Sequence, residues 1–411
     1  MTVTGPSHDP GVVDVVALGE SMVTFLPSTP GRLADVPSFD RAIGGAESNT
    51  ACMLAAAGHS VRWISRVGAD PFGDHLVETI AGHGVDVSSV DRDPGRPTGI
   101  YFRTAGDRAT DAHEVAYYRA GSAASAMTPE NVDMDAALTG RVLHLSGITA
   151  ALSDGCLHLL RELTAPRPGR PLISFDVNHR AGLWRNAAGP HVLLDLARRA
   201  DIVFVGEDEA EEAWGLTGGP TAIRQALPEP QTLVVKQGAK GATAFSEPTP
   251  SRGRRHDDLP PPVPPVQPAG SRAAEAMGVP PLDRSRERGR AGADGAPSAP
   301  GCATDTRPAA AQGTFVPALT VNVVATVGAG DAFAAGFLSA GLRALPVRER
   351  LRYGHLFAAA ALTTPGDLAP PPSTALAGRL AALDDAAWGR LRLGPGWTTA
   401  MERADEEVRT P

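Results

Sequence analysis

Short apolar segments alternate with helix-like segments along most of the chain, and this alternation restricts the fold more than any other feature. Residues 12–18 form a short apolar run followed by Gly19, as expected of a buried strand that ends at a turn. The pattern predicts an α/β domain with a doubly wound, mostly parallel sheet. Further strands are expected at 61–67, 141–145, 171–175, 202–205 and 232–236, and helices at 47–57, 71–83, 153–163, 191–199, 207–214, 331–342 and 347–363.

Two pairs of short segments rich in β-branched and aromatic residues interrupt the alternation. One pair is 22–25 with 40–43, and the other is 99–103 with 115–119. Residues of these types favour strands. The two pairs predict a small separate sheet, within about residues 20–43 and 97–120, that acts as a lid over the site.

Residues 248–311 differ in composition from the rest of the chain. They contain 13 prolines and no Phe, Trp, Tyr or Ile. Such a segment cannot bury enough apolar surface to offset the entropy lost on ordering. We therefore expect a disordered insertion in one domain that spans residues 12–385, with tails at 1–11 and 386–411. The insertion could also serve as a docking site through its arginines, or cover or regulate the site beside it.

The charge balance restricts the partners of the chain. It has 38 basic and 46 acidic residues, a formal net charge of −8, which disfavours binding to nucleic acid or to an anionic membrane. Its apolar runs are far shorter than the ~20 residues that span a bilayer. Cys52, Cys156 and Cys302 are scattered without metal-binding spacing, and residues 1–11 lack a signal-peptide pattern. We expect a cytoplasmic protein with no nucleic-acid or membrane partner.

The segment 321–331 combines an expected strand, a turn of small residues and the start of a helix. At Gly328, Ala329 and Gly330 an anion can approach the free backbone amides of the helix N-terminus. Asp331 follows directly, and a carboxylate beside an anion hole suits a base that deprotonates a hydroxyl attacking a phosphoryl group. Asp331 could equally complement the helix dipole alone, and this segment does not separate the two interpretations.

A second glycine-rich segment lies near the start of the chain. It contains the glycine pair Gly44 and Gly45, then Asn49 and two further spaced glycines. Together with the turn before Asp331, this segment resembles the two signatures of the PfkB, or ribokinase-like, carbohydrate kinases. The resemblance implies a ribokinase-like Rossmann-type three-layer α/β/α domain with a small β-sheet lid. It also implies ATP as the phosphoryl donor, Mg²⁺ as the bridging ion and Asp331 as the catalytic base.

Within this family, five stretches are most similar to the kinases that phosphorylate 2-keto-3-deoxygluconate, a sugar acid. The similarity implies a kinase that acts on the primary hydroxyl of this substrate. Arg119 and Arg180 carry planar, permanently charged groups that suit its carboxylate. Tyr101 and Tyr117 would add hydroxyl contacts from the lid, and the glycine pair with Asn49 would face the sugar hydroxyls. The five stretches are 64–73, 96–102, 117–125, 143–148 and 175–180.

Other interpretations of these residues stay open. The tyrosines and arginines could pair with local carboxylates instead of a ligand. The chain could phosphorylate a neutral sugar such as fructose or ribose, or it could bind sugar with little catalysis. Exposed lid strands would also suit a homodimer.

The nucleotide side of the site resembles the family less completely. Lys236, Gly238 and Gly241 match the strand and glycine turn that lie near ATP in this family. Glu209 matches the surviving member of a motif that organises Mg²⁺ and phosphate, and its contact with the ion would be indirect. Gly206 replaces the asparagine of the same motif.

Two further positions depart from the family pattern. Ala325 stands where relatives carry an aspartate that helps to ligate a monovalent cation, so that cation site should be weakened or lost. Phe357 stands where many relatives carry an asparagine near the adenine. The resemblance therefore implies that the base and the anion hole are intact, whereas several of the family residues around them are replaced.

Overall fold

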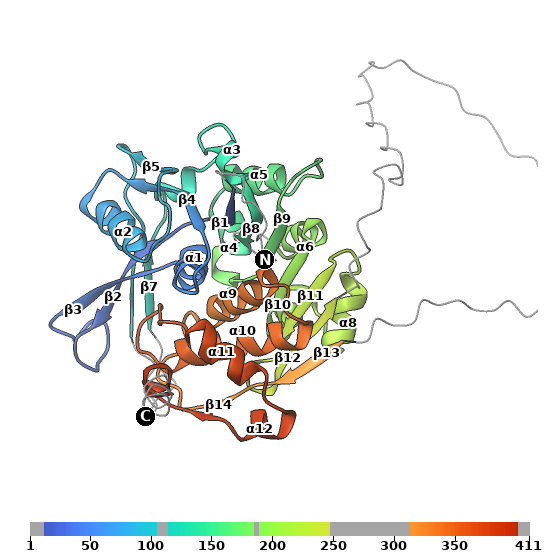
Figure 1. The fold of residues 1–411 in the computed structure, drawn as a ribbon. Helices are drawn as coiled ribbons and strands as arrows, with labels where there is room; N and C mark the ends of the chain where they lie inside the picture. The colour runs from blue at the N-terminus through green and yellow to red at the C-terminus, as the bar shows by residue number, and fades with distance from the viewer. Residues whose placement is uncertain (1–11, 105–113, 185–188, 247–312, 402–411) are drawn as a thin grey trace, which may run out of the picture. The chain divides into compact units, whose positions relative to one another are not determined.

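The computed structural model describes residues 12–104, 114–184, 189–246 and 313–401 (Figure 1). The insertion expected at 248–311 and the tail expected at 1–11 lie outside these residues. The described chain is built around one large sheet with helices on both of its faces, and a smaller sheet stands apart from it.

Nine strands form the main sheet, in the order β13-β12-β11-β10-β9-β8-β1-β4-β5. All neighbours from β11 to β5 are parallel, so the predicted doubly wound sheet is confirmed. The antiparallel edge formed by β12 and β13 was not predicted. The strands are β1 (Val13–Leu18), β4 (Val61–Gly68), β5 (Val90–Asp93), β8 (Gly140–Ser146), β9 (Leu172–Asp176), β10 (Ile202–Gly206), β11 (Thr232–Lys236), β12 (Gly241–Ser246) and β13 (Thr314–Pro317).

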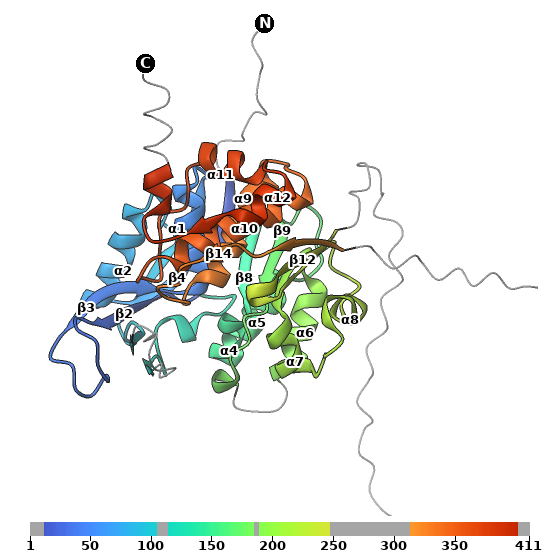
Figure 2. The ribbon, with the colours of Figure 1, turned by 90° about the horizontal axis from the view of Figure 1, so that it is seen from below.

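Two apolar clusters cover opposite faces of the main sheet, because its strands are buried on both sides. Along β1, Val15 and Ala17 belong to one cluster, whereas Val16 and Leu18 belong to the other. The predicted three layers are therefore confirmed (Figures 1 and 2). One face carries α1 (Ala46–Ala56), α2 (Pro71–Gly82), α9 (Ala329–Leu342), α10 (Val347–Leu362) and α11 (Thr374–Ala381); the other carries α3 (Met134–Ala137), α4 (Gly147–Leu152), α5 (Asp154–Leu163), α6 (Gly189–Arg199), α7 (Glu207–Trp214) and α8 (Gly219–Ala226).

The strand expected at the start of the segment 321–331 is wrong for most of its length. β14 (Thr320–Val321) has two residues and pairs with β15 (Arg392–Leu393), outside the main sheet. The chain then binds to the end of α10 instead of a strand, because the amides of Val324 and Ala325 both donate to the Leu362 carbonyl oxygen, at 2.7 and 3.3 Å. This pairing carries the chain to the turn at which α9 begins.

The smaller sheet has the strand order β3-β2-β6-β7, and it is formed by the segments expected to make a separate β-sheet. Its inner packing is aromatic, since the rings of Phe25 and Phe102 stack with centroids 4.8 Å apart. The edge strand β7 leaves Tyr118 64% exposed. We call this sheet the lid sheet; its strands are β2 (Met22–Pro27), β3 (Phe39–Gly44), β6 (Ile100–Arg103) and β7 (Val115–Tyr118).

The domain extends beyond its expected end at residue 385. Residues 386–401 were expected to be a tail, but they complete α12 (Asp385–Arg390), form β15 and continue to a further buried aromatic side chain. Trp388 and Trp397 are 1% and 6% exposed in the same apolar cluster as α9 and α10. The burial of two large apolar rings is the physical reason why this segment is ordered on the domain.

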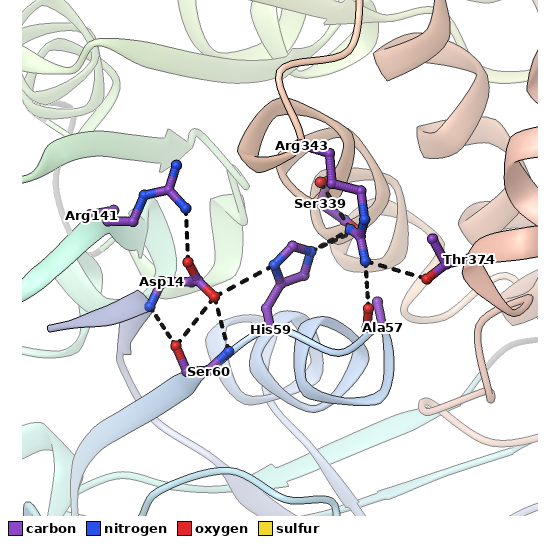
Figure 3. Close-up of polar contacts among 8 residues, drawn as sticks. All are labelled: Asp14, Ala57, His59, Ser60, Arg141, Ser339, Arg343 and Thr374. Atoms are coloured by element: carbon purple, nitrogen blue, oxygen red, sulfur yellow. Dashed lines mark hydrogen bonds and ion pairs between the residues drawn. The ribbon is translucent and has the colours of Figure 1, made fainter. Parts of the chain in front are cut away.

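A polar cluster anchors the C-terminal end of α9 to the edge of the main sheet at which the parallel strands begin (Figure 3). Arg343 donates to the carbonyl oxygen of Ala57 at 2.7 Å, and His59 lies 3.0 Å from the Ser339 hydroxyl and 3.7 Å from an Asp14 oxygen. Burial lowers the pKa of His59 to about 4, so its ring is neutral near pH 7. The cluster fixes the far end of the helix whose first turn carries Asp331.

Candidate active site

A cavity of about 450 Å³ lies between the lid sheet and the carboxyl ends of the parallel strands. Glu20 reaches it just after β1, Asp176 at the end of β9 and Lys236 at the end of β11. The strand order reverses between β1 and β8, and in open α/β sheets such a reversal leaves a crevice in which ligands bind. The fold therefore supplies a ligand site at this edge.

Most residues predicted for the site line this cavity, including both glycine-rich segments. Asn49 and Asp331 are 282 positions apart in sequence and meet there. The predicted residues in the lining are Gly44, Gly45, Asn49, Tyr101, Tyr117, Arg119, Arg180, Glu209, Lys236, Gly328, Gly330 and Asp331. Ala329, Gly238 and Gly241 are not in the lining.

Asp331 faces the cavity from the first turn of α9. Its Oδ2 atom accepts a hydrogen bond from the Nδ2 atom of Asn49 at 2.9 Å, and its backbone oxygen accepts one from the Thr50 hydroxyl at 3.3 Å. Helix α1 thus holds the carboxylate and its backbone in place. This contact is the physical link between the two glycine-rich segments.

The surroundings of Asp331 favour its protonated form. Burial raises the pKa of Asp331 to about 7, the nearby Asp176 and Glu47 carboxylates act in the same direction, and the Asn49 hydrogen bond and the Lys236 charge oppose them. A carboxyl with a pKa near neutrality is a stronger base than an ordinary aspartate and is still partly ionised at pH 7. These properties suit proton abstraction from a hydroxyl.

Lys236 provides a fixed positive charge beside Asp331. Its Nζ atom lies 3.1 Å from both carboxylate oxygens of Asp176. Burial alone would lower the pKa of Lys236, but the carboxylates of Asp176 and Glu209 raise it, so the ammonium stays charged. A Cβ atom on Gly330 would lie 3.6 Å from Nζ, which puts this cation next to the turn that starts α9.

The turn before α9 has the geometry of an anion hole. Gly328 adopts φ 77°, which favours glycine, and no side chain of the described residues caps the helix N-terminus. A Cβ atom on Gly328 would lie 2.4 Å from the carbonyl oxygen of Asp367. The turn is therefore packed against the loop that follows α10, and its amides are available to an anionic ligand.

Arg119 and Arg180 differ in how free they are to bind a ligand. Arg119 makes an ion pair with the buried carboxylate of Glu20, the local pairing that was one of the interpretations left open. Arg180 is 57% exposed, and among the described residues its ion-pair partner is Glu209, with a carboxylate oxygen 3.8 Å away. Arg180 is therefore the more accessible cation, while Arg119 presents a partly neutralised fork.

The two tyrosines of the lid sheet are also unequal. The Tyr101 hydroxyl donates to the carboxylate of Asp367, so towards a ligand it offers only its acceptor lone pairs. Tyr117 is 54% exposed, and its ring centroid lies 5.4 Å from that of Tyr101 and 5.8 Å from the Arg119 guanidinium. On the side of the lid sheet, the cavity is thus lined by the two tyrosine rings and the Arg119 guanidinium.

Five polar residues of the cavity were not predicted as site residues: Glu20, Asp176, Asn178, Thr326 and Asp367. Asp176 is the last residue of the parallel strand β9 and Asn178 follows it by two positions, a location that could have identified both. Asn178 adopts φ 38°, and within the described structure its buried Oδ1 atom has no hydrogen-bond partner. Strain and an unpaired polar atom are common at ligand sites. Asp367 lies in a loop without any comparable sequence signal.

On the nucleotide side of the site, the residues that depart from the family pattern provide few groups that could contact a ligand. Ala325 is buried and brings no carboxylate, so the residues present do not fit a monovalent-cation site that depends on one. Phe357 is 2% exposed within the apolar cluster and presents no polar group. Gly206 donates its amide to Glu209 at 2.7 Å, so Glu209 caps α7 with one oxygen. Gly241 has φ 143°, and a Cβ there would lie 2.3 Å from the Val316 carbonyl oxygen.

The described residues fit a magnesium ion that is held mainly by a ligand. They contain no group of three or more His, Cys, Asp or Glu side chains arranged to hold a metal. Mg²⁺ usually keeps several waters and takes one or two carboxylates together with substrate phosphates. Glu209, which is 14% exposed and lines the cavity, is a carboxylate of this kind.

The chain is similar to known carbohydrate kinases. Residues 13–271 and 300–374 match the family described as pfkB family carbohydrate kinase. A 2-dehydro-3-deoxygluconokinase of Bacillus subtilis is 30% identical over 362 residues, 87% of this chain and 91% of that protein. One from Thermoproteus tenax is 36% identical over 237 residues, 57% of this chain and 72% of that protein.

A plant fructokinase and a solved structure are similar as well. The fructokinase of Solanum tuberosum is 26% identical over 248 residues, 60% of this chain and 74% of that protein. The crystal structure of a PfkB protein from Polaromonas sp. JS666 is 28% identical, with a TM-score of 0.66 over 90% of this chain and all of that one.

Proposed function

The chain belongs to the pfkB family of carbohydrate kinases, and we propose that it transfers the γ-phosphoryl group of ATP to the primary hydroxyl of 2-keto-3-deoxygluconate. It is a sugar kinase, a phosphotransferase with an alcohol as acceptor, and ATP is the donor used in this family. The observation that carries the proposal is Asp331, held by Asn49 beside the uncapped turn at 328–330.

In the proposed reaction, Asp331 takes the proton of the attacking hydroxyl. The backbone amides at the start of α9 stabilise the charge that develops on the transferred phosphoryl group. Lys236 holds further positive charge next to this turn. The glycine pair, Asn49 and the lid residues position the sugar. When bound with the nucleotide, Mg²⁺ neutralises phosphate charge, and Glu209 would help to hold it through water.

The charges of the cavity support a need for that ion. Five carboxylates line it (Glu20, Asp176, Glu209, Asp331 and Asp367) against three basic side chains (Arg119, Arg180 and Lys236). All three basic side chains already face carboxylates at ion-pair distance, on Glu20, Asp176 and Glu209. The lining thus has little spare positive charge for the phosphates of ATP, and a divalent cation would provide it.

The identity of the sugar rests on the relatives and on the arginines. The two relatives named 2-dehydro-3-deoxygluconokinase favour a sugar acid, and Arg180 offers an accessible fork for its carboxylate. The fructokinase relative favours a neutral sugar as the second candidate. A coupled assay of ADP release with 2-keto-3-deoxygluconate, gluconate, fructose and ribose decides between them. Highest kcat/KM on fructose would contradict the proposed substrate, and no turnover on any sugar would indicate a binding protein.

Two expectations about the whole protein also remain proposals. The edge strand β7 exposes Val115, Tyr117 and Tyr118, which supports a homodimer formed through the lid sheets. No helix within the described ranges is long and apolar enough to cross a bilayer. A cytoplasmic location stays our expectation from the composition of the chain.

Substitution of the two arginines should reduce selectivity for the acid. Arg180→Lys and Arg119→Lys each replace a planar fork by a point charge, so kcat/KM for 2-keto-3-deoxygluconate should fall about 10-fold while that for fructose changes little. Arg62→Lys, which alters an ion pair with Asp86 away from the cavity, serves as the control. If both cavity variants keep the wild-type preference for the acid, the two arginines do not bind its carboxylate.

The pKa of Asp331 predicts how activity depends on pH. Since the base must be ionised, kcat/KM should rise about tenfold per pH unit below pH 7 and level off above it. The stability of the fold should change in the opposite direction. The folded chain keeps the Asp331 proton up to about pH 7, whereas an aspartate with the ordinary pKa of 3.8 loses it earlier, so rising pH destabilises the fold across this window.

Rate and melting profiles between pH 5 and about 9 test both directions. Asp331→Asn should remove the stability change in this window and melt at a higher temperature than the wild type above pH 7. A kcat/KM profile that is flat from pH 5 to about 8 would contradict the assignment of Asp331 as the titrating base.

A further inference from the structure

Helices α1 and α9 pack against each other, and polar contacts join them at both ends. Where they begin, beside the cavity, Asn49 donates to the Asp331 carboxylate at 2.9 Å, and the Thr50 hydroxyl donates to the Asp331 backbone oxygen at 3.3 Å. Where they end, the Arg343 guanidinium donates to the Ala57 carbonyl oxygen at 2.7 Å. Beginning meets beginning and end meets end, so the two helices run in the same direction.

Arg343 also binds the residues that surround the ends of both helices (Figure 3). Its Nη1 atom lies 2.5 Å from Nε2 of His59 and 2.5 Å from the Ser339 hydroxyl oxygen. Because an arginine only donates, Nε2 of His59 accepts and the ring proton is on Nδ1, which faces an Asp14 oxygen at 3.7 Å. Burial, and after it the charge of Arg343, lower the pKa of His59 to about 4. The ring therefore stays a neutral acceptor near pH 7.

Between the two ends, the helices interlock weakly. Asp331, Ala335 and Ser339 follow one another at intervals of four, so they share the face of α9 that meets α1. The middle position of this face thus carries only a methyl group. On α1, the residue midway between the two contacts is Met53, whose thioether chain is flexible. Such side chains resist sliding along the helix axis less than branched ones, so the polar contacts must fix the register.

A shift of α9 at its far end would reach the catalytic end. The 12 residues from Asp331 to Arg343 span about 18 Å of helix, and a helix is stiff along its axis. A slide of roughly 1 Å, common where helices repack, is enough to break a hydrogen bond as short as that between Asn49 and Asp331. The contacts at the two ends are therefore mechanically coupled.

We propose that Arg343 is a positioning residue: through Ala57 and His59 it sets the register of α9 along α1, and thereby the contact between Asn49 and Asp331. Arg343 acts from the end of the helix remote from the cavity, and it touches no ligand. The consequence for the rate rests on the proposed function, in which Asp331 is the base. The consequence for the packing of the two helices does not.

Arg343→Met tests the proposal, because methionine keeps an unbranched apolar stem and loses every donor. The Asn49 hydrogen bond is one of the interactions that oppose the raised pKa of Asp331. If the register slips, this bond weakens, so the rise of kcat/KM with pH should move to higher pH. We expect kcat/KM to fall about threefold more at about pH 6 than at about pH 9, the size of losing one ordinary hydrogen bond.

Arg170→Met is the matched control. Arg170 is also partly buried, and it donates to the Pro171 carbonyl oxygen at 2.9 Å and to the Asp201 carboxylate at 3.1 Å, partners that belong to neither helix. The control should lower the melting temperature and leave the shape of the pH profile unchanged. If Arg343→Met also lowers only the melting temperature, its role is structural and the proposal is overturned.

A double-mutant cycle with Asn49→Ala provides a readout that does not depend on activity. Substitutions at sites this far apart normally change stability additively. If Arg343 acts through the register, the double variant should lose less melting temperature than the sum of the two single losses, because either substitution alone already frees the helices to slide. Additive losses would overturn the proposal. If the wild type phosphorylates no sugar, the proposed function fails on that result, and this cycle still decides the coupling of the two ends.

A second variant covers the case in which Arg343→Met does not fold. Arg343→Lys keeps a cation that can reach one acceptor but not several at once. It should move the pH profile in the same direction, with a loss at about pH 6 of roughly twofold relative to about pH 9. A folded Arg343→Lys variant with the wild-type pH profile and additive melting losses would overturn the proposal.

Discussion

Asp331→Asn should lower kcat by roughly 10²-fold or more, the size typical of losing a general base. The amide has nearly the same shape as the carboxylate and retains a hydrogen-bond acceptor for Asn49, which donates at 2.9 Å in the wild type. It cannot accept the proton of the attacking hydroxyl. Steady-state rates with saturating ATP and sugar measure the effect.

Sugar binding provides the control for Asp331→Asn. Because the variant keeps the cavity shape, titration calorimetry should give a dissociation constant for the sugar within a few-fold of the wild type. Turnover close to that of the wild type would show that Asp331 only complements the dipole of α9, the interpretation that the sequence left open. Loss of sugar binding would show that Asp331 acts mainly as a ligand contact.

Gly328→Ala should also reduce kcat strongly, by about 10²-fold, the cost of losing a donor in an anion hole. The residue has φ 77°, which strains an alanine, and the new Cβ atom would lie 2.4 Å from the backbone oxygen of Asp367. Backbone cannot move aside as a flexible side chain can. The turn must therefore shift, and its amides would no longer point at the phosphoryl group.

Gly84→Ala separates the effect of strain from the effect of the clash. Gly84 has a similar φ of 85°, but a Cβ atom there would meet no atom within 4 Å, and it lies in the loop after α2, outside the cavity lining. We expect it to lower the melting temperature slightly and to leave kcat unchanged. Equal effects of the two variants on kcat would mean that general destabilisation, and not the anion hole, accounts for the loss.

Much of the fold was determined by local features of the sequence. The apolar runs of β1 and β9, and the glycine that follows β1, predict buried strands, because burial on both faces requires mostly apolar residues. The aromatic segments of the lid sheet were identifiable for a similar reason, since they favour strands without fitting the main alternation. The glycine-rich turns were also readable, because the close approach of a ligand to backbone amides requires residues without large side chains.

The charge pairing in the cavity was decided only by the tertiary structure. From its residue type alone, Arg119 could bind the carboxylate of a ligand. In the structure it pairs instead with Glu20, which lies 99 positions earlier in the sequence. Asp367 pairs with Arg103, which lies 264 positions away, and no local pattern marks either residue as belonging to the other. Likewise, the sequence of residues 386–401 predicts a tail. In the structure Trp388 and Trp397 are buried in the apolar cluster that contains α9 and α10. Periodicity and turn chemistry are properties of single segments, and sequence alone reports them. Which charges neutralise one another, and which surface a distant tryptophan covers, depends on how the strands cross, and only the folded chain determines that.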